Sequence, residues 1–137
     1  MKRREFIKKS GIACLTCIGM PVLLNSCNTL YNIPNASNEN KIIIKKSDFG
    51  QNINSIVRNE RLQAPIYLLK ISESEYSAVL MLCTHKGCEL NVAGSLLICP
   101  CHGSEFSGSG KVQTPPADMD LQKFIVTSDA DSIYIKL

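Results

Sequence analysis

The residues of this 137-residue chain with the most evident chemistry lie in two short segments. Residues 83–88 have the sequence CTHKGC, and residues 99–104 have the sequence CPCHGS. Together they hold four of the seven cysteines and both histidines of the chain. Thiolate sulfur and imidazole nitrogen are good ligands for zinc and for iron–sulfur clusters. The spacing therefore predicts a metal centre formed by two loops that the fold must bring together.

From the residue types alone, the two segments could also hold free cysteines or a structural zinc ion. Free cysteine is common in protein cores as a small apolar residue. Six cysteines and histidines in two tight groups argue against that interpretation. A structural zinc site is a stronger alternative, because zinc accepts two cysteines and two histidines. Such a site uses four ligands, however, and would leave two of the cysteines without a role.

The pattern C-x-H-x-x-C with C-x-C-H-G-S closely resembles the Rieske 2Fe–2S proteins. The similarity is to the disulfide-containing branch, the Rieske subunits of cytochrome bc- and b6f-type quinol oxidoreductases. In that family two cysteines hold one iron and two histidines hold the other. The resemblance implies a Rieske-type 2Fe–2S cluster. Its predicted ligands are Cys83, His85, Cys99 and His102.

The resemblance also assigns roles to residues beside the ligands. It implies a disulfide between Cys88 and Cys101 that joins the two cluster loops. Ser104 matches the serine whose hydroxyl bonds a bridging sulfide in the family. Two residues later, high-potential members have a tyrosine, and this chain has Phe106. We therefore expect one hydrogen bond fewer and a lower reduction potential than in the tyrosine-bearing relatives.

Two further segments bear on the surroundings of the cluster and on partners. Residues 108–117 resemble the proline-rich third loop that covers the cluster in the family. Lys86 stands at the tip between ligands, where quinol-oxidising members typically have leucine. A lysine ammonium is strongly hydrated and costly to desolvate. It would disfavour insertion into a quinol pocket and could direct the tip towards an acidic partner.

The number of histidines argues against an oxygenase. A Rieske-type oxygenase needs a second, mononuclear iron held by two histidines and a carboxylate. The chain has no histidine beyond the two predicted ligands. We therefore predict one-electron transfer, with no substrate-turnover site in this chain. The implied partner is a membrane cytochrome or quinol-oxidising subunit, or alternatively the catalytic subunit of a periplasmic oxidase such as arsenite oxidase; a structural zinc-binding module is the second alternative.

The amino-terminal segment resembles a twin-arginine export signal. Residues 1–9 carry five Lys/Arg and one Glu, with an arginine pair followed by Phe. The apolar stretch over residues 12–24 is short for a membrane span and fits a signal. Residues 24–27 resemble a lipobox, which makes Cys27 the lipidation candidate. We expect residues 1–27 to be a signal or membrane anchor, and the protein to be exported and tethered at the outer face of the cytoplasmic membrane or in the periplasm.

The remaining chain predicts a tether and one small domain. Residues 28–40 are rich in asparagine and predict a flexible tether, whereas residues 41–137 form the domain. Residues 50–62 are ambiguous between a short helix and a loop. The apolar runs that predict strands lie at 41–45, 66–71, 78–82 and 95–98, with a hairpin over 121–137 that turns at 129–131. The resemblance implies an all-β fold, an antiparallel sandwich with a small cluster-binding subdomain of loops.

The charge of the chain is concentrated at its amino terminus. The whole chain has a formal net charge of +3, but residues 41–137 contain ten basic and ten acidic residues. A nucleic-acid-binding domain needs a basic patch on its folded surface. We therefore expect no nucleic-acid partner.

Overall fold

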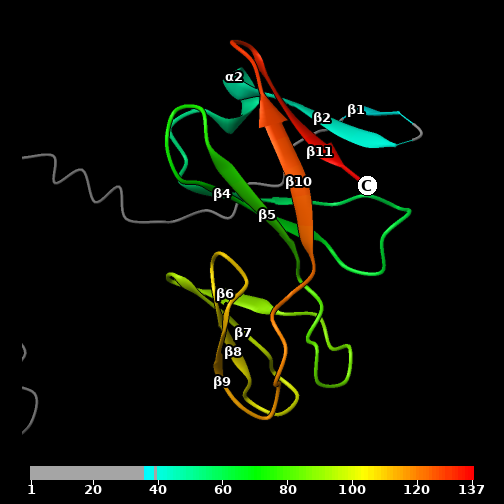
Figure 1. Ribbon diagram of the computed structural model, residues 1–137, viewed down its shortest axis with the longest axis vertical. Coiled ribbons are helices and arrows are strands. Elements are labelled where there is room, and N and C mark those ends of the chain that lie inside the picture. The colour runs from blue at the N-terminus through cyan, green and yellow to red at the C-terminus, as the bar shows by residue number, and fades with distance from the viewer. Residues whose placement is uncertain (1–35, 39) are drawn as a thin grey trace, which may run out of the picture.

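The computed structural model describes residues 36–38 and 40–137, and it is almost entirely antiparallel β-structure (Figure 1). One helical turn, α2 (Lys46–Phe49), interrupts the strands. The strands of the larger sheet are β1 (Ala36–Asn38), β2 (Lys41–Lys45), β3 (Asn54–Val57), β4 (Ile66–Lys70), β5 (Tyr76–Leu80), β10 (Lys123–Ser128) and β11 (Ser132–Lys136). The strands of the smaller sheet are β6 (Asn91–Ala93), β7 (Leu96–Ile98), β8 (Glu105–Ser107) and β9 (Val112–Thr114). The predicted all-β fold is confirmed.

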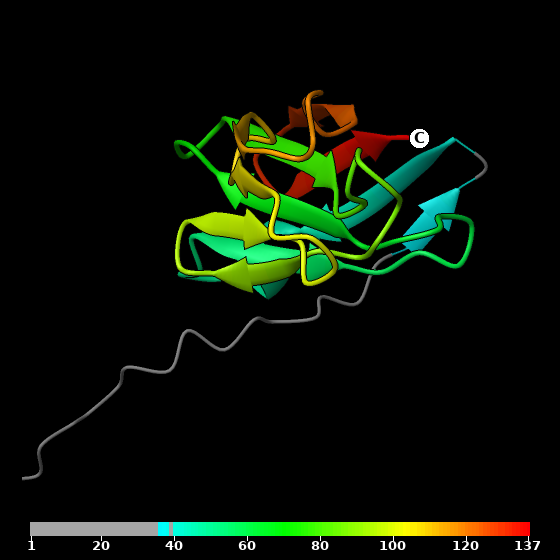
Figure 2. The same ribbon diagram turned by 90° about the horizontal axis from the view of Figure 1, so that it is seen from below.

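The larger sheet folds over on itself to make a sandwich. Its strand order is β1-β2-β11-β10-β5-β4-β3. β10 changes partner along its length, because Lys123 and Phe124 pair with β5 and the following residues pair with β11. Strands that switch partners in this way form the corners of β-sandwiches. The two halves of the sheet face each other in Figure 2 and enclose a core that we call the base core. Its buried members are Ile42, Ile44, Phe49, Val57, Ile66, Leu68, Ala78, Ile133 and Ile135.

The strand pair β4–β5 is buried on both of its faces. Ile66 and Leu68 point into the base core, whereas Tyr67 and Val79 belong to a second core against the smaller sheet. Strands covered on both faces have nearly continuous apolar sequences, as the predicted runs at these positions do. Figure 1 shows the smaller sheet, β6-β7-β8-β9, below this pair. The central strands are therefore the platform on which the two cysteine–histidine segments are built.

Most of the predicted strands are confirmed. The run at 41–45 is β2, and the runs at 66–71 and 95–98 agree with β4 and β7 to within one residue. The run at 78–82 contains most of β5, although the strand begins and ends two residues earlier. The C-terminal hairpin forms as β10 and β11. More buried and less buried residues alternate as expected, with partly buried residues in β10 and fully buried ones in β11, because one face of each strand packs on the base core.

Two segments contain strands that the sequence did not predict, for physical reasons. The ambiguous segment 50–62 contains the strand β3, whose polar residues Asn54 and Ser55 hide the alternation of its inward face. β1 pairs with β2 inside the segment that was predicted as a tether. Backbone hydrogen bonds hold such a short edge strand together, and its sequence Ala-Ser-Asn gives no strand signal. The folded part thus includes the residues of β1, which precede Lys41.

The predictions for the amino terminus fall on a part of the chain that the structure does not describe. The signal or anchor over residues 1–27, the lipidation candidate Cys27 and most of the predicted tether lie outside the described residues. Across residues 36–38 and 40–137, no helix has both the length and the apolar character needed to cross a membrane.

Candidate metal centre

The two cysteine–histidine segments form two loops of equal length. Loop 1, residues 83–88, follows β5, and the antiparallel bridge between Leu82 and Glu89 closes it. Loop 2, residues 99–104, connects β7 to β8, and the pairing of Ile98 with Glu105 closes it. Each loop therefore presents six residues from an antiparallel base.

The two loops also share their internal hydrogen bonds. The N–H of the first residue donates to the carbonyl of the sixth, from Cys83 to Cys88 and from Cys99 to Ser104, both at 2.8 Å. This bond bends each loop back on itself. The middle residues are then projected from the fold and are free to hold a ligand.

Glycine stands at the fifth position of each loop for a conformational reason. Gly87 and Gly103 have φ angles of 73° and 76°, in the left-handed region that other residues enter at a cost. Their N–H groups donate to the carbonyl oxygens of Cys83 and Cys99, at 2.8 and 3.0 Å. The glycine turn thus holds the first cysteine of each loop in place.

These first cysteines are buried thiols. Cys83 is 3% exposed and Cys99 is 2% exposed, both are unoxidised, and both belong to the second core. Burial raises the pKa of the Cys99 thiol. Hydrogen bonds from the Cys101 backbone, the Cys83 side chain and the His102 backbone lower it, and the net effect is a pKa below the ordinary value. Amide donors aimed at a sulfur suit a thiolate that binds a metal.

The two histidines lie side by side at the ends of the loops. The ring centroids of His85 and His102 are 4.9 Å apart, and the rings are nearly perpendicular. His102 is exposed and His85 is partly buried. The Nδ1 atom of His85 is buried without a hydrogen-bond partner among the described residues. A buried polar nitrogen without a partner is costly, so this atom fits a metal ligand. The structure thus places the two predicted imidazoles beside each other and the two predicted thiols beside each other, one of each from loop 1 and one of each from loop 2.

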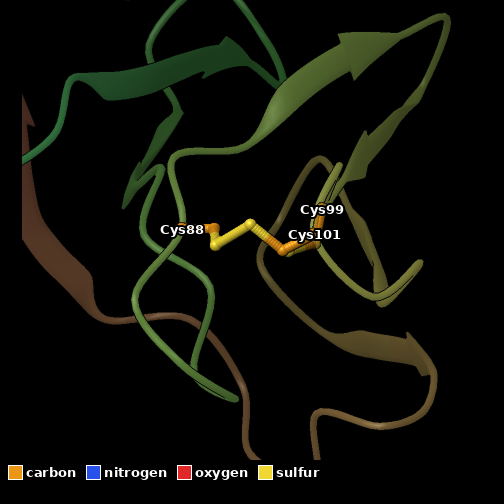
Figure 3. Close-up of side chains that lie close together, drawn as sticks. All are labelled: Cys88, Cys99 and Cys101. Atoms are coloured by element: carbon orange, nitrogen blue, oxygen red, sulfur yellow. A yellow bond between two sulfur atoms is a disulfide. The ribbon is translucent and has the colours of Figure 1, made fainter.

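The predicted disulfide is confirmed. Cys88 of loop 1 and Cys101 of loop 2 are joined by an S–S bond of 2.00 Å, with their Cα atoms 6.5 Å apart (Figure 3). The sulfur atoms of Cys88, Cys99 and Cys101 all lie within 4.8 Å of one another. Because Cys88 and Cys101 are bonded to each other, the free thiols among the described residues are those of Cys83 and Cys99.

A third loop ties loops 1 and 2 together. The hydroxyl of Thr84 donates to the carbonyl of Met119 at 2.8 Å, and the N–H of Ala117 donates to Ser104 Oγ at 2.9 Å. Ser104 is fully buried, and its hydroxyl keeps a proton that it can donate to a further acceptor. The segment after β9 therefore contacts both loops.

The same loop is held at its far end by Asp120. Its carboxylate accepts the N–H of Val112 at 2.9 Å and pairs with Lys111 at 3.3 Å. These partners, the Val112 N–H first, hold the pKa of Asp120 below its ordinary value. Neither Thr84 nor Asp120 was predicted from the sequence, because their partners lie 35 and 8 residues away along the chain.

The two departures from the family pattern lie in different environments. Phe106 is fully buried in β8 and belongs to the second core together with Cys99. Lys86 is exposed, as expected for the fourth residue of a projecting loop. The first residue can therefore act on the interior of the site, and the second on its outer surface.

Comparison with known proteins agrees with this geometry. The profile of the Rieske [2Fe-2S] domain family matches residues 40–125. The cytochrome b6-f complex iron-sulfur subunit of Prochlorococcus marinus subsp. pastoris is 37% identical over 76 residues, which cover 53% of this chain and 43% of that protein. The subunit of the same name from Synechococcus sp. strain JA-2-3B'a(2-13) is 43% identical over 53 residues, which cover 37% of this chain and 31% of that protein. The chain thus matches less than half the length of these relatives.

A solved structure extends the similarity to the fold. The cyanobacterial plasma membrane Rieske protein PetC3 from Synechocystis PCC 6803 superposes with a TM-score of 0.57 at 28% identity, covering 68% of this chain and 95% of that one. The family match spans both loops, the disulfide and the whole smaller sheet. The protein therefore belongs to the Rieske [2Fe-2S] domain family, and its cofactor is a Rieske-type 2Fe–2S cluster.

Proposed function

We propose that Cys83 and Cys99 hold one iron of the cluster, that His85 and His102 hold the other, and that the protein transfers single electrons. The observation that supports this most directly is that the same two loops carry two buried free thiols and two adjacent imidazoles, and that one imidazole has a buried nitrogen without a partner. When bound, the cluster supplies a one-electron redox site, and its imidazole ligands give it a higher potential than clusters with four cysteines.

The rest of the site holds these ligands in place and shields the cysteine ligands from water. The disulfide and the third loop restrict movement of loop 1 against loop 2. The second core excludes water from the cysteine side, whereas exposed His102 brings the other side to the surface. Because electron transfer needs little atomic movement and close approach, a rigid site with one exposed edge suits a carrier.

For the partner, we propose a membrane-associated redox complex that oxidises quinol and reduces a cytochrome. The named relatives are subunits of a cytochrome b6-f complex, which supports this assignment. Export through residues 1–27 and anchoring at Cys27 belong to the same proposal. The intact mass of the mature protein tests them: a lipid-modified chain beginning at Cys27 is expected, and an unmodified chain beginning at Met1 would contradict lipidation.

A specific observation supports a second partner class, a periplasmic oxidase that uses the protein as its electron-transfer subunit, as arsenite oxidases do. Lys86 is exposed on the loop that carries a predicted histidine ligand. An ammonium group there favours a hydrated, acidic docking surface over an apolar pocket.

Reduction kinetics with the purified partner complex separate the two partners. In the cluster-loaded protein, Lys86→Leu is expected to speed reduction through a quinol pocket and Lys86→Glu to slow it only modestly. With an acidic protein partner, Lys86→Glu is expected to slow transfer at least tenfold at low salt, and high salt should weaken the effect. Electron transfer at wild-type rates by a variant that cannot hold the cluster, such as Cys99→Ala, would overturn the proposed function itself.

A further inference from the structure

The third loop is closed at its base by contacts that converge on one aspartate. Asp120 Oδ1 accepts the N–H of Val112 at 2.9 Å, and Asp120 Oδ2 lies 3.3 Å from Lys111 Nζ. Beside these contacts, the N–H of Leu121 donates to the carbonyl of Gly110 at 2.8 Å. These five residues are fastened to one another, and we call them the neck of the third loop.

The neck rests on the strand that leads into loop 1. A Cβ on Gly110 would lie 2.8 Å from Val79 Cγ1 in β5, so the absence of a side chain at Gly110 lets the neck approach this strand. Leu121 is 3% exposed and packs with Val79 in the second core. β5 ends at Leu80, shortly before Cys83 begins loop 1. The neck and loop 1 therefore share one support.

The third loop contacts both cluster loops close to Asp120 in the chain. The carbonyl of Met119, the residue before Asp120, accepts the hydroxyl of Thr84 in loop 1 at 2.8 Å. The N–H of Ala117 donates to Ser104 Oγ in loop 2 at 2.9 Å. Each contact is a single hydrogen bond, which cannot hold a loop whose base is free to open. Fixing Asp120 therefore also fixes the backbone that joins loops 1 and 2.

We propose that Asp120 is a positioning residue for the cluster: it holds the third loop closed against loops 1 and 2, and so slows loss of the cluster. The inference rests on the proposed function, because it requires that these loops hold a cluster. Of the two partners of Asp120, the Val112 N–H carries the effect. The Lys111 side chain is 67% exposed, and such a surface ion pair contributes little, whereas an amide bound to a carboxylate makes a strong hydrogen bond.

The test follows the visible absorption of the full, cluster-loaded chain in an excess of an iron chelator. Asp120→Ala removes both contacts and should lose the cluster at least about fivefold faster than wild type, because the neck opens more often. Asp120→Asn keeps an oxygen for the Val112 N–H, and Lys111→Ala keeps the carboxylate. Both should stay within about twofold of the wild-type rate.

The contrary result would place the closure of the loop elsewhere. If Asp120→Ala loses the cluster at the wild-type rate, the bond between Leu121 and Gly110 is sufficient for the neck and the proposal is overturned. If Asp120→Asn is as fast as Asp120→Ala, the acceptor oxygen is not the cause, which also overturns it. A wild-type chain that holds no cluster would overturn the proposed function itself, and this inference with it.

Asp129→Ala is the matched control for general destabilisation. Asp129 also accepts backbone N–H groups, from Asp131 and Ser132, and the hydroxyl of Tyr134. These contacts lie at the turn between β10 and β11, which Figure 1 shows at the opposite end of the domain from the smaller sheet. The variant should be destabilised in urea and keep the wild-type rate of cluster loss. Equally fast loss in Asp129→Ala and Asp120→Ala would contradict a positioning role.

Amide hydrogen exchange reports the opening of the third loop directly. In the cluster-loaded chain, the N–H groups of Val112 and Ala117 should exchange at least about fivefold faster in Asp120→Ala than in wild type. Asp120→Asn should restore their protection, and Asp129→Ala should leave it unchanged. If Asp120→Ala loses its cluster quickly while both amides stay protected, the loop remains closed and the proposal is overturned.

Discussion

Loops 1 and 2 have one backbone plan and two different sets of side chains. Both begin with a buried cysteine, turn at a glycine in the fifth position and close with the same hydrogen bonds. The second position holds Thr84 in loop 1 and Pro100 in loop 2. The loops also differ at the third, fourth and sixth positions. Loop 1 has His85, Lys86 and Cys88 there. Loop 2 has Cys101, His102 and Ser104 there.

The comparison separates what the backbone provides from what the side chains provide. The shared plan supplies one thiol from each loop. The predicted histidine ligand is the third residue of loop 1 and the fourth residue of loop 2, so the two loops place it differently. The cysteine left over in each loop completes the disulfide between them. Two loops with equivalent backbones therefore make an asymmetric site. Lys86 of loop 1 is exposed at the surface, whereas Ser104 of loop 2 is buried.

The largest effect is expected at the fourth position. His102→Ala should abolish the cluster because it removes a proposed iron ligand, whereas Lys86→Ala should keep it. Iron and acid-labile sulfide per chain measure both variants. Equal cluster content in the two proteins would mean that the fourth position of loop 2 has no special role.

The bond between the loops should have the next largest effect. Replacing both Cys88 and Cys101 by serine is expected to lower the free energy of unfolding of the cluster-free chain by about 3 kcal/mol, since the disulfide restricts the unfolded chain. Urea unfolding of the full chain under non-reducing conditions measures it. If a dithiol lowers wild-type stability by a similar amount and leaves the variant unchanged, the loss belongs to the disulfide. An unchanged midpoint in the variant would contradict the prediction.

Alanine substitution of the two loop glycines tests whether the backbones of loops 1 and 2 are equivalent. Gly87→Ala and Gly103→Ala should each destabilise the protein by about 1–2 kcal/mol, because alanine enters the left-handed region at that cost. A Cβ at either position meets nothing within 4 Å, so steric clash adds nothing. Gly94, with a φ of 62° and equally open surroundings, is the matched control outside both loops. The Gly94→Ala variant should be destabilised by a similar amount and bind the cluster normally. Unequal losses of stability for Gly87→Ala and Gly103→Ala would show that the two loop backbones are not equivalent.

The smallest effect concerns the fully buried Phe106. Phe106→Tyr should raise the reduction potential by about 40 mV, the equivalent of one hydrogen bond of about 1 kcal/mol that favours the reduced cluster. A redox titration followed by visible circular dichroism measures the shift. Phe106→Leu lacks the hydroxyl and should show no rise. A rise in the leucine variant, or none in the tyrosine variant, would remove hydrogen bonding as the cause.

Prediction from the sequence was most successful where the chemistry is local. The two segments of predicted metal ligands follow from residue types at short spacing, and the strands of the base core follow from long apolar runs. The pairing of Cys88 with Cys101 was implied by the family resemblance, and the structure confirms it. The short strands β1, β3, β6, β8 and β9 were not predicted. They depend on backbone pairing with partners elsewhere in the chain.

The matched geometry of loops 1 and 2 was also out of reach of the sequence. The glycines share a spacing from the first cysteine, but the closing pairs at Leu82 and Ile98 require the folded sheets. The third-loop contacts of Thr84 and Asp120 depend on tertiary structure in the same way. No periodicity or motif encodes them.

The most direct test of the account is electron spin-echo spectroscopy of the reduced protein with ¹⁵N-labelled histidine. Because the chain has only two histidines, each coupled histidine nitrogen can be assigned with single variants. The account predicts that two histidine nitrogens are strongly coupled to the reduced cluster, one from each loop. A cluster spectrum without histidine coupling, or with coupling from only one loop, would contradict the proposed ligand set.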